Sequence, residues 1–107
     1  MNVREMEVLN IVCAAGEPIT SSDIVRCKRD LTQSTVIAVL RKLCEWEMVS
    51  VVGATHSGKV LSRQYVSGPK AREAIENYYL QEFARTKDIL PADDLMELIK
   101  RFKKMQK

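Results

Sequence analysis

The stretch from Leu31 to Trp46 constrains the fold of this chain more than any other, because its apolar residues repeat with the period of an α-helix. At spacings of i, i+3, i+4 and i+7 the sequence carries Val36, Val39, Leu40, Leu43 and Trp46. Thr32 stands just before this pattern, where its hydroxyl can accept a hydrogen bond from an N–H group of the first turn. The stretch therefore predicts a helix that begins after Thr32 and buries one face.

The opposite face of this helix carries short side chains and one long cation. Ser34, Ile37, Ala38 and Arg41 fall on or near it, and the first three turns contain no acidic residue. Because such a face can lie close to a polyanion, we interpret the helix as the recognition helix of a helix-turn-helix motif. An ordinary amphipathic helix in a small bundle is the alternative, and the pattern of this helix alone favours that alternative.

Two further helices are predicted before this one. The first covers Val3–Ala15 and ends at Gly16, which is typical of a helix C-terminus. Thr20–Asp23 then resembles a capping box, with Asp in place of the usual Glu or Gln, and opens a short helix that runs to about Lys28. The residues expected to be buried by this short helix are Ile24 and Cys27.

A β-hairpin is predicted after the recognition helix. Met48–Gly53 and Val60–Val66 are short and rich in β-branched residues, and they bracket the glycine-containing segment Ala54–Lys59. Helix, turn, helix and a two-stranded ribbon is the order of a winged helix. The hairpin contains no acidic residue, so its basic side chains are expected to approach phosphates. The residues expected to contact DNA are Gln33, Ser34, Thr35, Ile37, Ala38, Arg41, Lys59 and Arg63.

Two apolar helical stripes follow the break at Ser67–Pro69, separated by Leu90 and Pro91. A small winged helix has limited surface to cover both stripes, so we expect them to meet a second copy of the chain and form a homodimer. Tyr78 and Tyr79 could alternatively stack on bases, although their helical spacing favours a core or dimer interface. The residues expected at the dimer interface are Ile75, Tyr78, Tyr79, Phe83, Leu95, Leu98, Ile99 and Phe102.

Length and composition limit the remaining possibilities. A chain of 107 residues is one domain, or one domain with an appendage, and we expect a winged-helix DNA-binding domain over residues 1–68 and a helical dimerisation segment over residues 69–107. The fold class expected is thus mostly α with a small β-hairpin. No apolar stretch can span a bilayer and the N-terminus does not resemble a signal peptide, so we expect a cytoplasmic protein with no membrane partner. Cys13, Cys27 and Cys44 form no C-x-x-C pair, which fits reduced thiols.

Enzyme chemistry is not expected. The segment Gly53–Val60 nearly matches a phosphate-binding loop, but Val60 has no hydroxyl to hold Mg²⁺ and a strand-like run follows. His56 is the sole histidine and no Ser or Cys has an obvious sequence partner for nucleophilic catalysis. The cysteines and His56 show no metal-ligand spacing. We therefore expect no catalytic residue, no metal and no cofactor.

Several of these segments resemble a known family. The run Ser34-Thr-Val-Ile-Ala-Val-Leu-Arg-Lys-Leu43 resembles the S-T-V-x-T-L-L-x-R-L signature of the penicillinase-repressor (BlaI/MecI/CopY) family. Thr20-Ser-Ser-Asp-Ile-Val25 is similar to that family's T-x-x-E-I-V. The resemblance implies a dimeric winged-helix repressor that binds a palindromic operator and is relieved by a sensor protease or, in one branch, by copper.

The sequence also departs from that family. Ala38 replaces the usual Thr, and Cys44–Glu47 replaces a basic helix end. The C-terminal cysteine cluster of the copper branch is absent. The family's sensor protease cuts an Asn-Phe bond, and alignment puts Glu82 where Asn is expected, followed by Phe83.

These observations favour a DNA-binding transcriptional repressor with double-stranded operator DNA as its partner. The alternative is a winged helix that serves only as a protein-protein interaction module. The near-neutral first two-thirds of the chain and the acidic end of the recognition helix favour this alternative. The acid-free hairpin and the short, uncharged front of the helix favour DNA.

Overall fold

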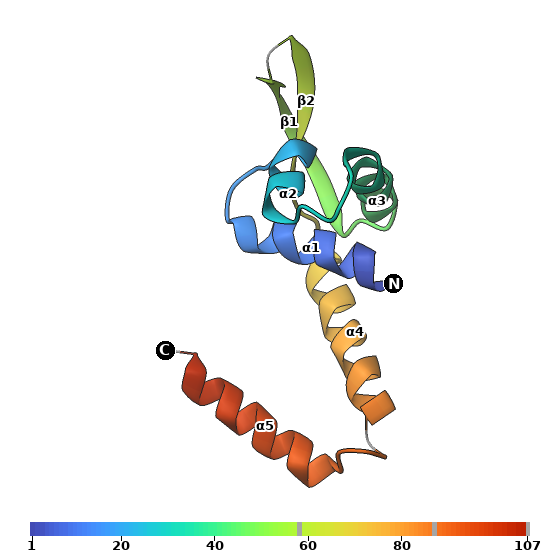
Figure 1. The fold of residues 1–107 in the computed structure, drawn as a ribbon, viewed down its shortest axis with the longest axis vertical. Helices are drawn as coiled ribbons and strands as arrows, with labels where there is room; N and C mark the ends of the chain where they lie inside the picture. Colours follow the sequence, from blue (N-terminus) through green and yellow to red (C-terminus); the bar gives the residue numbers. More distant parts are fainter. Residues whose placement is uncertain (58, 87, 107) are drawn as a thin grey trace. The chain divides into compact units, whose positions relative to one another are not determined.

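Five helices and one antiparallel hairpin make up the chain, as the sequence predicted, and a computed structural model describes residues 1–57, 59–86 and 88–106. The elements in chain order are α1 (Val3–Ala15), α2 (Ser21–Cys27), α3 (Gln33–Glu45), β1 (Val49–Ser57), β2 (Val60–Ser67), α4 (Ala71–Thr86) and α5 (Ala92–Met105) (Figure 1). The chain divides into two compact units, Met1–Ile75 and Glu76–Lys107. Among the described residues no helix is long and apolar enough to cross a membrane.

Side-chain caps begin the first two helices. The Asn2 side chain accepts a hydrogen bond from the Glu5 N–H and the Asn2 N–H donates to the Glu5 carboxylate, each at 2.8 Å. The predicted capping box of α2 is present in the same reciprocal form, between Thr20 and Asp23. Gly16 ends α1 in the left-handed region at φ 70°, which a residue without a Cβ adopts readily. The predicted bounds of α1 are confirmed.

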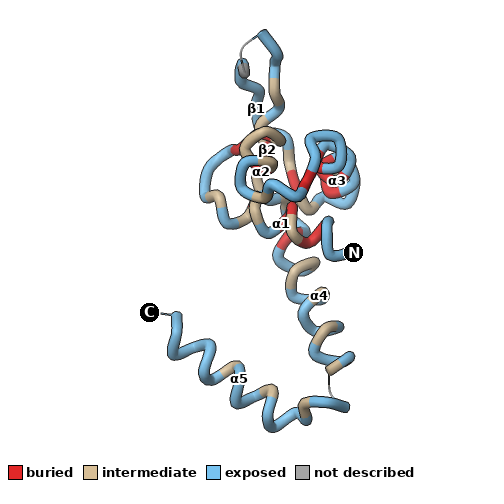
Figure 2. Tube along the Cα trace, viewed as in Figure 1, coloured by how far each residue is buried: buried red, intermediate tan, exposed pale blue. Residues whose placement is uncertain are grey.

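The first unit holds the hydrophobic core. Figure 2 shows the buried segments gathered where α1, α2, α3 and the base of the hairpin meet. A short bridge joins the loop after α1 to β2, because Ile19 and Tyr65 exchange backbone hydrogen bonds of 3.1 and 2.8 Å. The core consists of Val8, Leu9, Val12, Ile19, Ile24, Leu31, Val36, Val39, Leu40, Leu43, Val49, Tyr65 and Ala71.

The end of α3 differs from the prediction. Trp46 was expected on the buried stripe, but its side chain is 41% exposed. The helix ends at Glu45 with Trp46 as its C-cap, and Glu47 then takes a left-handed conformation at φ 60°, so the helical stripe does not continue through Trp46. Cys27, predicted to be buried, is also exposed because it lies in the last turn of the short helix α2.

The hairpin is longer than predicted. Ala54–Ser57 were expected to belong to the loop but continue β1, since Thr55 pairs with Ser62 and His56 with Leu61. A bulge between Val51 and Gly53 shifts the register of the two strands. The ladder therefore extends to Ser57 opposite Val60.

The first turn of α4 belongs to the first unit rather than to the tail. Ala71 is buried in the core, and Ala74 and Ile75 pack against it. For this reason the first unit extends to Ile75, beyond the boundary at residue 68 that the Ser67–Pro69 break suggested. In the second unit, α5 has no buried residue.

Gly68 provides a test of the packing between the hairpin and the end of α3. A Cβ at this position would lie 2.5 Å from the Glu47 carbonyl oxygen and 2.9 Å from the Met48 carbonyl carbon. Because backbone must move to relieve this contact, Gly68→Ala should lower the free energy of unfolding by roughly 1–3 kcal/mol. Urea denaturation measures this change.

Gly53→Ala is the matched control, because the new Cβ would meet only the Gln64 side-chain oxygen at 3.1 Å, and that flexible side chain can move. The control variant should be neutral or stabilised. Equal unfolding free energies for Gly68→Ala and the unmodified chain would contradict this account of the junction.

Candidate nucleic-acid interface

One face of α3 is buried and the other is exposed along its whole length. Val36, Leu40 and Leu43 are fully buried against the core. Lys42 reaches toward α1, where its Nζ lies 3.7 Å from the buried Glu5 carboxylate, but its side chain is 58% exposed. Arg41 is exposed as well. The six α3 residues predicted to contact DNA all lie on the exposed face: Gln33, Ser34, Thr35, Ile37, Ala38 and Arg41.

Hydrogen bonds fix the side chains at the start of α3. The Thr32 hydroxyl accepts from the Thr35 N–H at 3.2 Å, which confirms the predicted N-cap, and donates to the Thr35 hydroxyl at 2.8 Å. Gln33 donates from Nε2 to the Ser21 hydroxyl of α2 at 2.6 Å. No sequence pattern predicts this last bond, since its partners lie on different helices. It leaves the Gln33 carbonyl oxygen available as an acceptor.

Lys59 and Arg63 are both exposed but lie at different heights on the hairpin. Lys59 is in the turn, whereas Arg63 pairs with Ala54 further down the ladder, four residues and roughly 13 Å along the strand. Lys59 therefore lies at the tip of the hairpin and Arg63 further from it. Burial raises the pKa of the Cys44 thiol, and the positive charge of Arg63 opposes that rise.

A basic run that lies before α3 in the chain was not among the residues predicted to contact DNA. Arg26 and Arg29 are exposed at the end of α2 and in the turn before α3. Arg26 pairs with Asp23, and the pKa of Asp23 is lowered, first by the hydrogen bond from the Thr20 backbone and further by Arg26. The sequence signal for these two arginines is the run Arg26-Cys-Lys-Arg29, which ends four residues before α3 begins at Gln33.

Lys28, within the same run, lies near two carboxylates of the first unit. It lies 3.8 Å from a Glu7 carboxylate oxygen and 3.6 Å from an Asp30 oxygen, and Arg4 contacts the same two carboxylates at 3.2 and 2.8 Å. The hydrogen bond from Arg4 lowers the pKa of Asp30, and the same bond raises the pKa of Arg4. These four charges, of which Arg4 and Asp30 are exposed and Glu7 and Lys28 half-buried, connect α1 to the turn before α3, although ion pairs near the surface add little stability.

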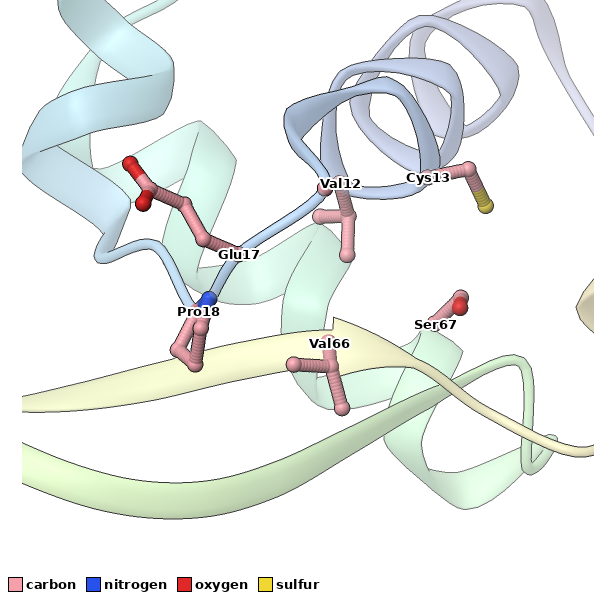
Figure 3. Close-up of a pocket in the computed structure, with 7 residues that line it drawn as sticks. Val12, Cys13, Glu17, Pro18, Val66 and Ser67 are labelled. Carbon is pink, nitrogen blue, oxygen red and sulfur yellow. The ribbon is translucent and has the colours of Figure 1, made fainter.

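The structure places the residues that were weighed for phosphate binding, nucleophilic catalysis and metal binding. His56 is exposed on the hairpin, Val60 begins a strand rather than a helix, and no group of three metal-ligating side chains occurs among the described residues. A cavity of about 220 Å³ lies beside the end of α1, smaller than typical ligand pockets. Burial raises the pKa of the Cys13 thiol there, which disfavours the thiolate. The cavity is lined by Val12, Cys13, Gly16, Glu17, Pro18, Val66 and Ser67 (Figure 3).

Solved structures of bacterial regulators share this architecture. Bacillus subtilis PadR in complex with operator DNA is 15% identical with a TM-score of 0.62, over 74% of this chain and 48% of PadR, so the chain spans about half of PadR. Streptococcus pneumoniae FabT in complex with DNA is 15% identical with a TM-score of 0.59, over 99% of this chain and 73% of FabT. The fold is a winged helix.

A third similar structure is a MarR family protein of Mycobacterium tuberculosis in complex with p-aminosalicylic acid. It is 19% identical with a TM-score of 0.55, over 100% of this chain and 80% of that protein. No protein-family model and no curated protein sequence matches the chain. In a winged helix α2 and α3 form the helix-turn-helix, α3 holds the position of the recognition helix, and β1 and β2 form the wing.

Proposed function

We propose that this chain is a DNA-binding transcriptional repressor that binds a palindromic operator as a homodimer. The observation that carries the proposal is the exposed face of α3, which holds no acidic residue from Gln33 to Cys44 and is fixed by a fully buried opposite face. The similarity in fold to PadR and FabT, both in complex with DNA, supports it. The resemblance of Ser34–Leu43 to the penicillinase-repressor signature also supports it.

Each part of the winged helix has a distinct role in this proposal. The start of α3 enters the major groove, where Gln33, oriented by Ser21, reads a base edge and Ile37 contacts a thymine methyl. Arg41 lies further along the same face. Lys59 binds a phosphate, and this contact holds the protein on the duplex without reading sequence.

The hairpin also supports a second candidate function, a protein-protein interaction module. Val52, Val60 and Leu61 are all more than half exposed on it, although apolar side chains are ordinarily covered. In that case the wing would dock on another protein and α3 would bind no DNA. Absence of any duplex binding by the intact chain at low salt would favour this function over repression.

Lys59→Ala tests the phosphate contact. Because the contact is electrostatic, the substitution should weaken all duplexes alike and reduce the slope of log K against log salt by about one unit. Lys100→Ala in α5 removes the same charge and is the control, which should leave the slope unchanged. The measurement is a salt titration of binding to two unrelated duplexes; an unchanged slope for Lys59→Ala would refute the contact.

Substitutions on α3 test sequence reading. Gln33→Ala, Ser34→Ala and Ile37→Ser should change the preferred duplex rather than weaken all duplexes equally, each by about 1–3 kcal/mol at one base position. The preference is measured by competition among duplexes that differ at single positions. If all three variants keep the preferred sequence, α3 is not the part that reads DNA.

The homodimer is proposed to form through the second unit. Tyr79, Phe83 and Phe102 are exposed there, Tyr78 and Leu95 are half-buried, and the two tyrosine rings meet edge to face at 5.4 Å. Ile75, which we also predicted at this interface, already packs against the core of the first unit. The residues that remain available for a second copy are Tyr78, Tyr79, Phe83, Leu95, Leu98, Ile99 and Phe102.

Leu98→Asp should turn the dimer into a monomer, because it places a charge in the α5 stripe and removes nothing that this chain buries. Binding through one half-site should then fall toward the non-specific range, roughly 10⁻⁴ to 10⁻⁶ M. Met96→Asp, beside the stripe on the same helix, is the control and should remain dimeric. Sedimentation at micromolar concentration measures the assembly; a dimeric Leu98→Asp variant would place the interface elsewhere.

We also propose that the chain resists a sensor protease that cuts Asn-Phe bonds. Glu82 replaces Asn, is held by Arg85 at 3.1 Å, and lies inside α4, which a protease would have to unwind. A pocket that recognises an amide would have to bury an unpaired carboxylate. Incubation with such a protease should leave the chain intact, whereas the Glu82→Asn variant should be cut before Phe83. Fragment masses showing efficient cleavage after Glu82 in the unmodified chain would contradict resistance.

A further inference from the structure

Helix α5 carries an apolar stripe that is left uncovered by the residues that the structure describes. Leu95, Leu98, Ile99, Phe102 and Met105 repeat at helical spacing, and α5 buries none of its residues. Leu98 is 44% exposed, Phe102 58% and Met105 78%. An exposed contiguous apolar stripe of this kind marks an interaction surface.

The stripe forms one wall of an open groove in the second unit. Tyr79 and Phe83 of α4 line the other wall, and the groove encloses about 790 Å³. Apart from Arg101, the lining is apolar or aromatic. An apolar lining of this kind suits the apolar face of another helix.

Charges on α5 are segregated along its length. Its first half carries Asp93, Asp94 and Glu97, and its second half carries the basic residues. Asp94 immediately precedes the stripe residue Leu95, and Arg101, two turns later, immediately precedes Phe102. Asp94 and Arg101 therefore lie on the same edge of the stripe, with opposite charges two turns apart. The basic residues of the second half are Lys100, Arg101, Lys103 and Lys104.

We infer that the stripe of α5 is covered by α5 of a second copy of this chain, packed antiparallel. The inference rests on the proposed homodimer and specifies its geometry. Antiparallel packing sets Asp94 against the partner's Arg101, and the two-fold axis repeats that contact with the roles exchanged. A parallel pair would instead align acidic half with acidic half and basic half with basic half, which is repulsive.

The acidic first half and basic second half of α5 also have a cause within the single helix. The experiment must distinguish that cause from pairing between copies. Acidic residues at the start of a helix and basic residues at its end stabilise that helix alone, through its macrodipole. That effect acts on the far face of α5 as well as beside the stripe. Only pairing between copies makes the effect of the charge at position 94 on dimerisation depend on the charge at position 101.

Charge exchange on the full-length chain tests the pairing. Asp94→Arg and Arg101→Asp should each raise the dimer dissociation constant roughly tenfold, since two attractive contacts become repulsive. The double variant Asp94→Arg/Arg101→Asp should restore dimerisation to within about threefold of the unmodified chain, because it recreates both contacts with the charges reversed. Sedimentation equilibrium at low salt measures each dissociation constant.

Glu97→Arg is the matched control, because it makes the same charge change on the face away from the stripe and should weaken the dimer less than about threefold. An equal mixture of the two single variants should form heterodimers in preference to either homodimer. Failure of the double variant to recover would overturn the antiparallel pairing while leaving a dimer in place. A monomeric unmodified chain would instead overturn the proposed homodimer itself.

Discussion

The burial of one face of α3 is the constraint on which the rest of the structure depends. Val36, Leu40 and Leu43 are removed from water completely, at about 1.5–3 kcal/mol of stabilisation each. Rotation of the helix by one residue would expose them and force Arg41 toward the core, where an unpaired charge is costly. The same packing that stabilises the first unit therefore determines which side chains α3 presents to a partner.

Polar contacts then fix details that burial leaves open. The Thr32 cap sets where α3 begins, the bond between Ser21 and Gln33 orients one exposed side chain, and Glu5 pairs with Lys42. Arg41 is exposed on the face of α3 that lies away from the core. In the proposed repressor the first unit supplies the reading surface, and the second unit supplies the symmetry that places two such surfaces on a palindrome.

Local signals were sufficient to predict the elements of the first unit. The bounds of α1, the capping box at Thr20 and the buried stripe of α3 follow from spacing and from side chains within one turn. The end of α3 was not predictable, because a left-handed Glu47 has no sequence signature comparable to a glycine and Trp46 fits the helical period. The bond from Gln33 to Ser21 and the bridge from Ile19 to Tyr65 were missed because tertiary packing creates them.

Selection of bound duplexes from a random DNA pool, with the intact chain, tests whether this protein is a dimeric DNA-binding repressor. We expect enrichment of one palindromic sequence whose half-sites are about one helical turn apart, because two α3 helices of a dimer must enter successive major grooves. Recovery of duplexes without a common sequence, at an affinity no better than that for random DNA, would contradict it.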